Sequence, residues 1–259
     1  QLRAMEDELG KQLLIRGAKG SRRVLLTEEG MILRKRAEEI LALVQRTEEE
    51  IMHDDEAVVG DVYIGAGETD IVRLLARAAR EIQKQHPDIR YHISSGNAEH
   101  VLEQLDKGLI DFGLLFGRTD TQKYEALPLP GKDTWGVLMR RDVPLAEKAS
   151  VAPGDLLEKP LILTGEPDDA QLLTRWLRPA GGAPHVVATY NLVYTAWLLV
   201  DEGLGYALCL DRLINTDGSR LCFRPLSPPL ESAASLVWKK YPAFSKAART
   251  FLSCLRGLL

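Results

Sequence analysis

The sequence contains little cysteine, and its cysteines are not arranged for a structural site. Only three occur in 259 residues, at Cys209, Cys222 and Cys254, and no two form a C-x-x-C pair. An odd number of distant cysteines argues against a disulfide framework and against a zinc site built on thiolates. The five histidines show no i, i+4 pairing, so we expect no bound metal.

Long apolar runs are also missing. No segment approaches the roughly 20 consecutive apolar residues that cross a bilayer. The start, residues 1–6, does not read as a signal peptide, so we expect a cytoplasmic protein. The net charge of −4 and the pI near 5.8 argue against a protein that binds polyanions over its whole surface. A local basic patch can still contact phosphates.

Motifs of common catalytic and nucleotide sites do not occur. There is no G-x-S-x-G nucleophile motif and no P-loop. Gly65-Ala66-Gly67 lacks the third glycine of a dinucleotide-binding fingerprint. We therefore expect neither an enzyme nor a cofactor.

The first 26 residues predict a short helix, a basic loop and a short strand. Leu2, Met5 and Leu9 recur at helical spacing, and Gly10 supplies a stop signal. The segment 16–23 then holds four cations and no acid.

Residues 27–52 predict a long helix with Thr27 as its N-cap. Its apolar positions step by four and three, as in a heptad repeat, with one polar interruption: Leu33, Ala37, Ile40, Val44, Thr47 and Ile51. We expect this helix to pair with a second copy in a symmetric homodimer, with a homotetramer left open. The alternative is an ordinary helix packed on its own domain.

From residue 60 the chain alternates between strands and helices, which predicts parallel sheets in an α/β fold of two lobes. The first set has strands at 61–65, 89–93 and 110–116 and helices at 69–85 and 98–105. The second has strands at 161–163, 186–188, 206–210 and 234–238 and helices at 168–177, 193–202 and 244–258. The last helix places Phe251, Leu255 and Leu258 on one side.

Residues 5–30 carry the most specific pattern. They resemble the second half of the winged helix-turn-helix of LysR-type transcriptional regulators, whose signature runs L-E-x-x-L-G-x-x-L-F-x-R, a basic wing, and L-T-x-x-G. Met5 and Leu14 replace the usual Leu and Phe. The matching segments are Met5-Glu6, Leu9-Gly10, Leu13 to Arg16 and Leu26 to Gly30, with weaker likeness at 60–65, 105–111 and 200–207.

The resemblance implies an architecture and a function. The architecture is two Rossmann-like lobes of the type II periplasmic-binding-protein kind, preceded by a dimerisation helix and a partial winged helix-turn-helix. The implied function is a DNA-binding transcriptional regulator controlled by a small-molecule effector bound between the lobes. A transport solute-binding protein is the alternative, and an enzyme on a similar scaffold is a third. The expected domains are 1–26 (winged helix-turn-helix), 27–59 (dimerisation helix), 60–132 (lobe I), 133–232 (lobe II) and 233–259 (return to lobe I).

The resemblance also assigns promoter-DNA contacts. Gln1 and Arg3 would reach base edges from the recognition helix, and the basic wing would contact phosphates through Arg16, Lys19, Arg22 and Arg23. The family's scaffold and positioning helices are absent from this chain. We therefore expect a frayed or repurposed start that binds DNA poorly, unless the preceding residues simply lie outside the chain.

Effector contacts are expected in the strand-to-helix turns, because ligands bind between lobes at the carboxyl ends of strands. Glu68 would disfavour an anionic effector unless a cation such as Arg118 balances it, so we expect a polar effector with at least one donor group. Each of these residues could equally be an ordinary turn residue. The candidates are Gly67, Glu68, Thr69, Gly96, Asn97, Phe116, Thr164, Gly165, Glu166 and Asn191.

Overall fold

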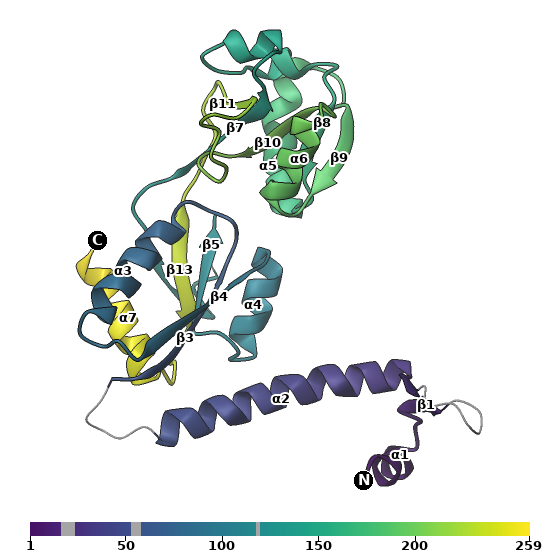
Figure 1. Cartoon of the computed structure of the whole chain (residues 1–259), viewed down its shortest axis with the longest axis vertical. Coiled ribbons are helices and arrows are strands. Elements are labelled where there is room, and N and C mark those ends of the chain that lie inside the picture. Colours follow the sequence, from purple (N-terminus) through teal and green to yellow (C-terminus); the bar gives the residue numbers. More distant parts are fainter. Residues whose placement is uncertain (17–23, 53–57, 118–119) are drawn as a thin grey trace. The chain divides into compact units, whose positions relative to one another are not determined.

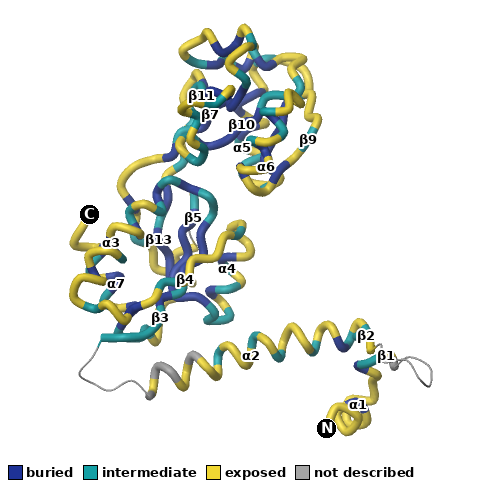
Figure 2. The backbone as a smooth tube through the Cα atoms, viewed as in Figure 1, coloured by how far each residue is buried: buried dark blue, intermediate teal, exposed yellow. Residues whose placement is uncertain are grey.

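The computed structural model describes residues 1–16, 24–52, 58–117 and 120–259 (Figure 1). The chain divides into two compact units, residues 1–60 and 61–259, which are described separately. Figure 2 shows that burial is concentrated in the strands of the second unit, whereas the helices of the first are largely exposed.

The first unit contains two helices and a two-stranded antiparallel sheet. Its elements are α1 (Leu2–Leu9), β1 (Leu14–Arg16), β2 (Val24–Leu26) and α2 (Glu28–Met52). The predicted short helix, short strand and long helix are confirmed. The wing residues Lys19, Arg22 and Arg23 lie outside the described residues.

The junction between the sheet and α2 explains part of the T-x-x-G pattern. The Thr27 hydroxyl accepts a hydrogen bond from the Gly30 backbone N at 3.0 Å, which confirms the predicted N-cap. A Cβ at Gly30 would lie 2.1 Å from the carbonyl oxygen of Leu13. Only glycine therefore allows α2 to approach the strand so closely.

Helix α1 corrects one expectation. We predicted a frayed or repurposed start. Fraying is wrong, because residues 2–9 are helical and Gly10 closes the helix in the left-handed conformation, with φ 62°. A changed role for this segment stays a prediction. Glu6 is buried and accepts hydrogen bonds from the backbone N of Leu13 at 2.9 Å and of Leu14 at 3.0 Å. These bonds tie the helix to the sheet, while most of its apolar side chains remain exposed.

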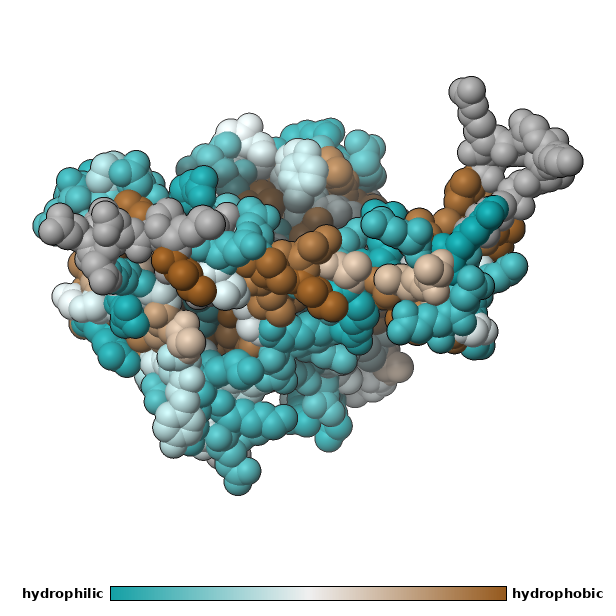
Figure 3. All heavy atoms as spheres, turned by 90° about the horizontal axis from the view of Figure 1, so that it is seen from below, coloured by the Kyte–Doolittle hydropathy of each residue, from teal (hydrophilic) through white to brown (hydrophobic). Residues whose placement is uncertain are grey.

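The predicted heptad face of α2 is largely exposed to solvent. Ile40, Val44 and Ile51 are 60%, 47% and 77% exposed, and Leu33 and Ala37 are half-buried. Met31, Ile32 and Leu41 add exposed apolar surface beside the heptad face. Figure 3 shows apolar side chains gathered along this helix.

Lobe I, within the second unit, is a five-stranded mixed sheet with three helices. The strand order is β4 (Ile89–Ser95), β3 (Gly60–Ala66), β5 (Phe112–Phe116), β13 (Ala234–Lys239) and β6 (Tyr124–Pro128). As predicted, β3 and β5 are parallel. The helices are α3 (Val72–Gln83), α4 (Ala98–Asp106) and α7 (Lys246–Gly257); α3 packs on α7, and α4 lies across the sheet from them (Figure 1).

Aromatic side chains fill the core of lobe I. The ring of Phe112 lies 5.6 Å from that of Phe251 and 6.2 Å from that of Trp238, in tilted and edge-on geometry. Phe251 and Leu255 are buried, as predicted. The same prediction is wrong for Leu258, which is 43% exposed because α7 ends at Gly257.

Lobe II is a six-stranded sheet with helices on both faces. The order is β11 (Leu221–Pro225), β7 (Asp133–Arg140), β10 (Tyr206–Leu210), β8 (Leu161–Thr164) and β9 (Val186–Tyr190), with β12 (Glu231–Ser232) also paired to β7. Val137 and Met139 share a core with α5 (Pro167–Leu177), whereas Leu138 shares a core with α6 (Val193–Asp201). Alternate residues of β7 thus face opposite helices.

Sequence patterns did not predict β1, β6, β7, β11 or β12. Strand β7 is buried on both faces and therefore lacks polar alternation. It is also interrupted by Gly136, where a Cβ would lie 2.1 Å from the Phe223 ring. The strands on either side of residues 129–132 and of Ala233 belong to different sheets. The predicted domain boundaries nearby stay predictions.

Candidate functional site

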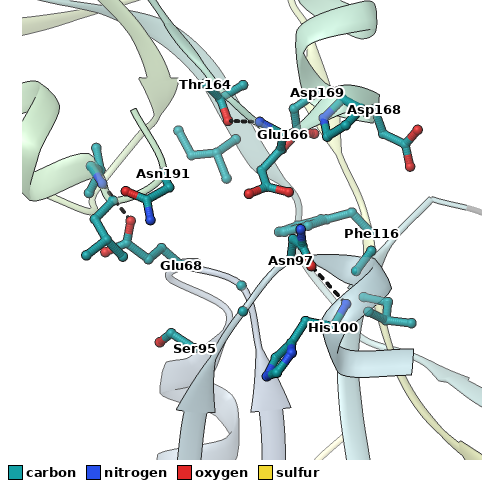
Figure 4. Close-up of a pocket in the computed structure, with 18 of the residues that line it drawn as sticks. Glu68, Ser95, Asn97, His100, Phe116, Thr164, Glu166, Asp168, Asp169 and Asn191 are labelled. Atoms are coloured by element: carbon teal, nitrogen blue, oxygen red, sulfur yellow. Dashed lines mark hydrogen bonds between the residues drawn. The ribbon is translucent and has the colours of Figure 1, made fainter. Parts of the chain in front are cut away.

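A cavity of about 600 Å³ lies between lobe I and lobe II. This volume is in the range of small-molecule sites. Its walls come mainly from turns that follow strands and from the first turns of α4, α5 and α6 (Figure 4). The lining residues are 67–68, 95–100 and 114–116 from lobe I, and Trp135, Thr164, 166–169, 190–193, Leu210 and Leu213 from lobe II.

Most of the candidate effector contacts line this cavity. Gly67, Glu68, Gly96, Asn97, Phe116, Thr164, Glu166 and Asn191 do so, whereas Thr69 and Gly165 do not. Whether any of them contacts an effector stays a prediction. Arg118, the cation suggested as a partner for Glu68, lies outside the described residues.

Thr69 is turned away from the cavity. It is buried, and its hydroxyl donates to Oδ2 of Asp133 while accepting from the backbone N of Ile71 at 3.0 Å. Helix α3 begins at Val72, so residues 69–71 form a turn rather than the predicted first turn of the helix. The hydroxyl that we expected to meet a ligand is used within the protein.

Gly165 does not line the cavity and instead takes part in strand pairing. Its backbone N donates to the carbonyl oxygen of Tyr190 at 2.7 Å and so extends the pairing of β8 with β9. A ligand would therefore have to break this bond to use the Gly165 N–H group.

Two helix starts at the cavity are capped by side chains of the protein. Asn97 Oδ1 accepts from the backbone N of His100 at the start of α4, at 2.8 Å. Glu68 Oε2 accepts from the backbone N of Val193 at the start of α6, at 2.7 Å. The second bond joins the two lobes, because Glu68 follows β3 and Val193 follows β9.

Acidic side chains gather at the start of α5. Glu166 is the N-cap residue, and Asp168 and Asp169 stand in the first turn. Figure 4 shows the Glu166 carboxylate pointing into the cavity. Burial, together with the neighbouring Glu166 and Asp168 charges, raises the pKa of Asp169 from 3.8 to about 6.

Aromatic side chains provide the apolar part of the wall. Trp135 is buried, and its indole N donates to the Ser232 hydroxyl at 3.0 Å. Tyr190 is also buried and donates its hydroxyl to the carbonyl oxygen of Leu208 at 2.7 Å. The polar atoms of both rings are thus satisfied, and the rings present mainly apolar surface.

Sequence reasoning missed several lining residues. His100 was weighed only as a metal ligand, and Trp135 lies on the unpredicted strand β7. Asp168 and Asp169 come just after the predicted turn at 164–166, separated from it by Pro167, and this position could have identified them. In the described part of the chain, no group of three or more His, Cys, Asp or Glu side chains is placed to hold a metal ion. No described helix is long and apolar enough to cross a membrane.

The predicted DNA contacts belong to the first unit. Gln1 and Arg3 are exposed at the start of α1. Arg16 ends β1, and its side chain lies outside what the structure describes. The DNA roles of all these residues, and of Arg22 and Arg23, stay predictions.

Known proteins resemble this chain along most of its length. Residues 56–259 match the model of the LysR substrate binding domain family. The HTH-type transcriptional regulator YvbU of Bacillus subtilis is 25% identical over 98% of this chain and 86% of its own length. The hydrogen peroxide-inducible genes activator of Dickeya chrysanthemi is 29% identical over 63% of this chain, which spans about half (52%) of that relative.

Solved structures share the fold. HinK, a LysR family transcriptional regulator from Pseudomonas aeruginosa, superposes with a TM-score of 0.66 at 21% identity, over 99% of this chain and 86% of that one. Full-length CbnR in complex with its target DNA gives a TM-score of 0.76 at 18% identity, over 99% of this chain and 88% of the CbnR chain. Because the family model covers well over half of the chain, the protein belongs to the LysR family of transcriptional regulators.

Proposed function

We propose that this protein regulates transcription at promoter DNA, without catalysing a reaction, and that a small-molecule effector in the interlobe cavity controls it. The observation that carries this proposal is the cavity itself, which is lined by both lobes. A ligand that contacts both walls binds one lobe arrangement better than another, and such differential affinity is what shifts a conformational equilibrium.

The loop between β3 and α3 is suited to transmit the state of the cavity. Three consecutive residues of lobe I contact lobe II: Glu68 bonds to Val193, Thr69 to Asp133, and Asp70 pairs with Arg212 at 3.2 Å. Gly67, next to them, lines the cavity. An effector that moves this loop would change all three bonds together. Coupling between sites is typically about 1–3 kcal/mol, which is within the reach of a few hydrogen bonds.

Helix α2 supports a homo-oligomeric regulator. Its exposed heptad positions would be covered by a second copy of the helix. In such an assembly, DNA-reading heads would be paired at a spacing set by the effector domains. We propose a homodimer or homotetramer on this basis.

Promoter DNA is the proposed partner of the first unit. Exposed Gln1 and Arg3 and the basic segment 16–23 support this role. A solved structure with the same fold is a complex with target DNA. The relatives named above are regulators, which argues against the alternative of a transport solute-binding protein. A protein that reads promoter DNA works beside the chromosome, so we propose a cytoplasmic location.

An electrophoretic shift assay would test this function. The DNA is the region upstream of the protein's own gene, and the response is measured with and without a low-molecular-weight extract of bacterial cells. We expect the extract to change the shift for the wild-type chain. Gly67→Phe should lose this response because it fills the cavity; the position has a non-positive φ, and the nearest atom to a Cβ is 3.9 Å away.

Gly154→Phe is the matched control. Gly154 is exposed, does not line the cavity, and a Cβ there meets nothing within 4 Å. Loss of the response in both variants, or in neither, would argue against an effector in this cavity. Absence of any sequence-specific shift would argue against DNA binding by this chain.

A further inference from the structure

The cavity between the lobes is strongly acidic. This inference rests on the proposed function and concerns the chemical class of the effector. Five lining residues carry carboxylates, and in the described residues of the wall the basic side chains are limited to one histidine, His100. The five acids are Glu68, Glu99, Glu166, Asp168 and Asp169. Low-dielectric walls strengthen the field of such charges on a ligand between them.

The three helix starts at the cavity, which could attract an anion, are each capped by a side chain of the protein or carry acidic residues. A helix start binds anions through its free N–H groups and its dipole. Here α4 is capped by Asn97 and α6 by Glu68 from the opposite lobe. The first turn of α5 carries Asp168 and Asp169. A carboxylate or phosphate ligand would compete with the protein's own oxygens at the starts of α4 and α6, and the charges of Asp168 and Asp169 would repel it at the start of α5.

The carboxylates at the start of α5 would gain from a bound cation. Asp169 is half-buried beside Glu166 and Asp168, and its raised pKa reflects that crowding. No ion pair joins these three carboxylates to a cation within the described residues, although ion pairs are common elsewhere in lobe II, for example between Arg220 and Asp201 at 2.7 Å. A positive ligand group would supply the missing partner.

The remaining wall suits an apolar body. Phe116 lies beside Glu166 in Figure 4, and the rings of Trp135 and Tyr190 and the side chains of Leu210 and Leu213 also line the cavity. Aromatic faces attract cations as well as hydrocarbon. The wall thus combines a negative region with an apolar one, as recognition of an amine on a hydrocarbon frame requires.

We propose that the effector is an organic cation, with at least one protonated amine held by Glu166 and Asp169 and an apolar body packed against Phe116 and Trp135. The amine supplies the donor hydrogens that these carboxylates accept. The interlobe bond of Glu68 to Val193 need not be broken to admit such a ligand.

Calorimetric titration of the full chain tests the sign of the ligand's charge. The probes are two sets of matched shape: phenethylamine, phenethyl alcohol and phenylpropionate, and cadaverine with glutarate. We expect the amines to bind and the neutral and anionic probes to bind at least about tenfold more weakly, as expected for a lost charge-assisted contact. The double variant Glu166→Gln/Asp169→Asn should lose about tenfold or more in amine affinity.

The control variant is Glu147→Gln/Asp217→Asn, which removes the same two charges from exposed positions of lobe II outside the wall. It should bind the amines as the wild type does. Amine binding that survives in E166Q/D169N, or that is lost equally in the control, would overturn the proposal.

Two outcomes separate this inference from the proposed function. If the anionic probes bind more tightly than the amines and Gly67→Phe abolishes their binding, the cavity is an effector site but its ligand class is wrong. Arg118→Gln then shows whether that arginine supplies the anion contact. If no probe of either charge binds and the extract has no effect on DNA binding, both proposals fail.

Discussion

The carboxylate of Glu68, after β3 of lobe I, accepts a hydrogen bond at 2.7 Å from the backbone N of Val193, the first residue of α6 in lobe II. This bond satisfies an N–H group at a helix start with a charged acceptor from the opposite lobe. Such charge-assisted bonds are stronger than neutral ones. Glu68 therefore helps to hold the two lobes together at the N-terminus of α6.

Replacing Glu68 should loosen the lobes. Glu68→Ala leaves the Val193 N–H without its acceptor, which costs about 1–3 kcal/mol in favour of a more open arrangement. We expect a larger radius of gyration in small-angle X-ray scattering. Glu147→Ala, at the exposed end of a short 3-10 helix in lobe II, should leave the radius of gyration unchanged. An E68A variant as compact as the wild type would show that this bond does not restrain the lobes.

Thr69 should contribute to stability through its hydroxyl. Asp133 is 1% exposed, its Oδ2 accepts from Thr69, and its Oδ1 has no partner in the described structure. Thr69→Val would leave a second buried oxygen unpaired and should lower the free energy of unfolding by about 1–3 kcal/mol. Urea denaturation measures this loss.

Thr69→Ser is the matched variant, because it keeps the hydroxyl and removes only a methyl group. It should recover most of the lost stability. Equal destabilisation by valine and serine would mean that packing of the methyl group, not the hydrogen bond, matters here.

Asp169 should make stability depend on pH in mildly acidic solution. Its pKa in the folded protein is about 6, raised by burial and by Glu166 and Asp168, against an ordinary value of 3.8. Between these values the folded state holds a proton that the unfolded state has released. Stability from this group is therefore present below about pH 4 and is lost as the pH rises to about 6.

Asp169→Asn removes that dependence. As the pH rises from about 4 to 7, the free energy of unfolding of the variant should increase relative to that of the wild type by on the order of 1 kcal/mol. Thermal denaturation across this range measures the difference, with Asp217→Asn as the exposed control. A difference that stays constant with pH would show that Asp169 ionises normally in the folded protein. Amine binding should weaken below about pH 6, because Asp169 is then protonated.

Cys209 should be inert in the native protein. Burial raises the pKa of its thiol to about 12, with smaller contributions from Asp211 and Glu68. The thiolate is the reactive form, so alkylation or oxidation at neutral pH should be slow. Mass spectrometry after a brief iodoacetamide or peroxide pulse should find Cys209 unmodified until guanidinium unfolds the chain.

The half-buried Cys254 is the internal comparison and should react first. Rapid native oxidation of Cys209 would contradict this prediction.

The heptad face of α2 should be required for formation of the homo-oligomer. Ile40→Glu places a charge on the heptad face, where the native side chain is 60% exposed in the single chain. We expect a shift towards monomer in light scattering coupled to size exclusion. Ala42→Glu adds the same charge on the opposite side of the helix, at another exposed position, and should leave the oligomer intact. An unchanged molar mass for I40E would show that this face of α2 does not form the oligomer interface.

Local signals in the sequence were sufficient for many elements. The heptad steps of 33–51, the Thr27 cap and the alternation of strands and helices after residue 60 depend on neighbours along the chain. The structure confirms these elements. Strand β7 was not predicted because both of its faces are buried by partners far along the chain. Leu258 was wrongly predicted to face the core because the predicted helix ended at residue 258, whereas α7 ends at Gly257.

The turns after the strands could be identified from the sequence because the carboxyl ends of parallel strands meet at one edge of a sheet. Which atoms in those turns face the cavity depended on contacts between lobes. Thr69 turns to Asp133, and Glu68 reaches Val193, 125 residues away. Side-chain direction follows the partner that satisfies a polar group, and that partner is set only when the lobes fold together. The sequence alone thus determined the family and most of the turns that line the candidate cavity, whereas the tertiary structure decided the charge of that cavity and the bonds that join its two walls.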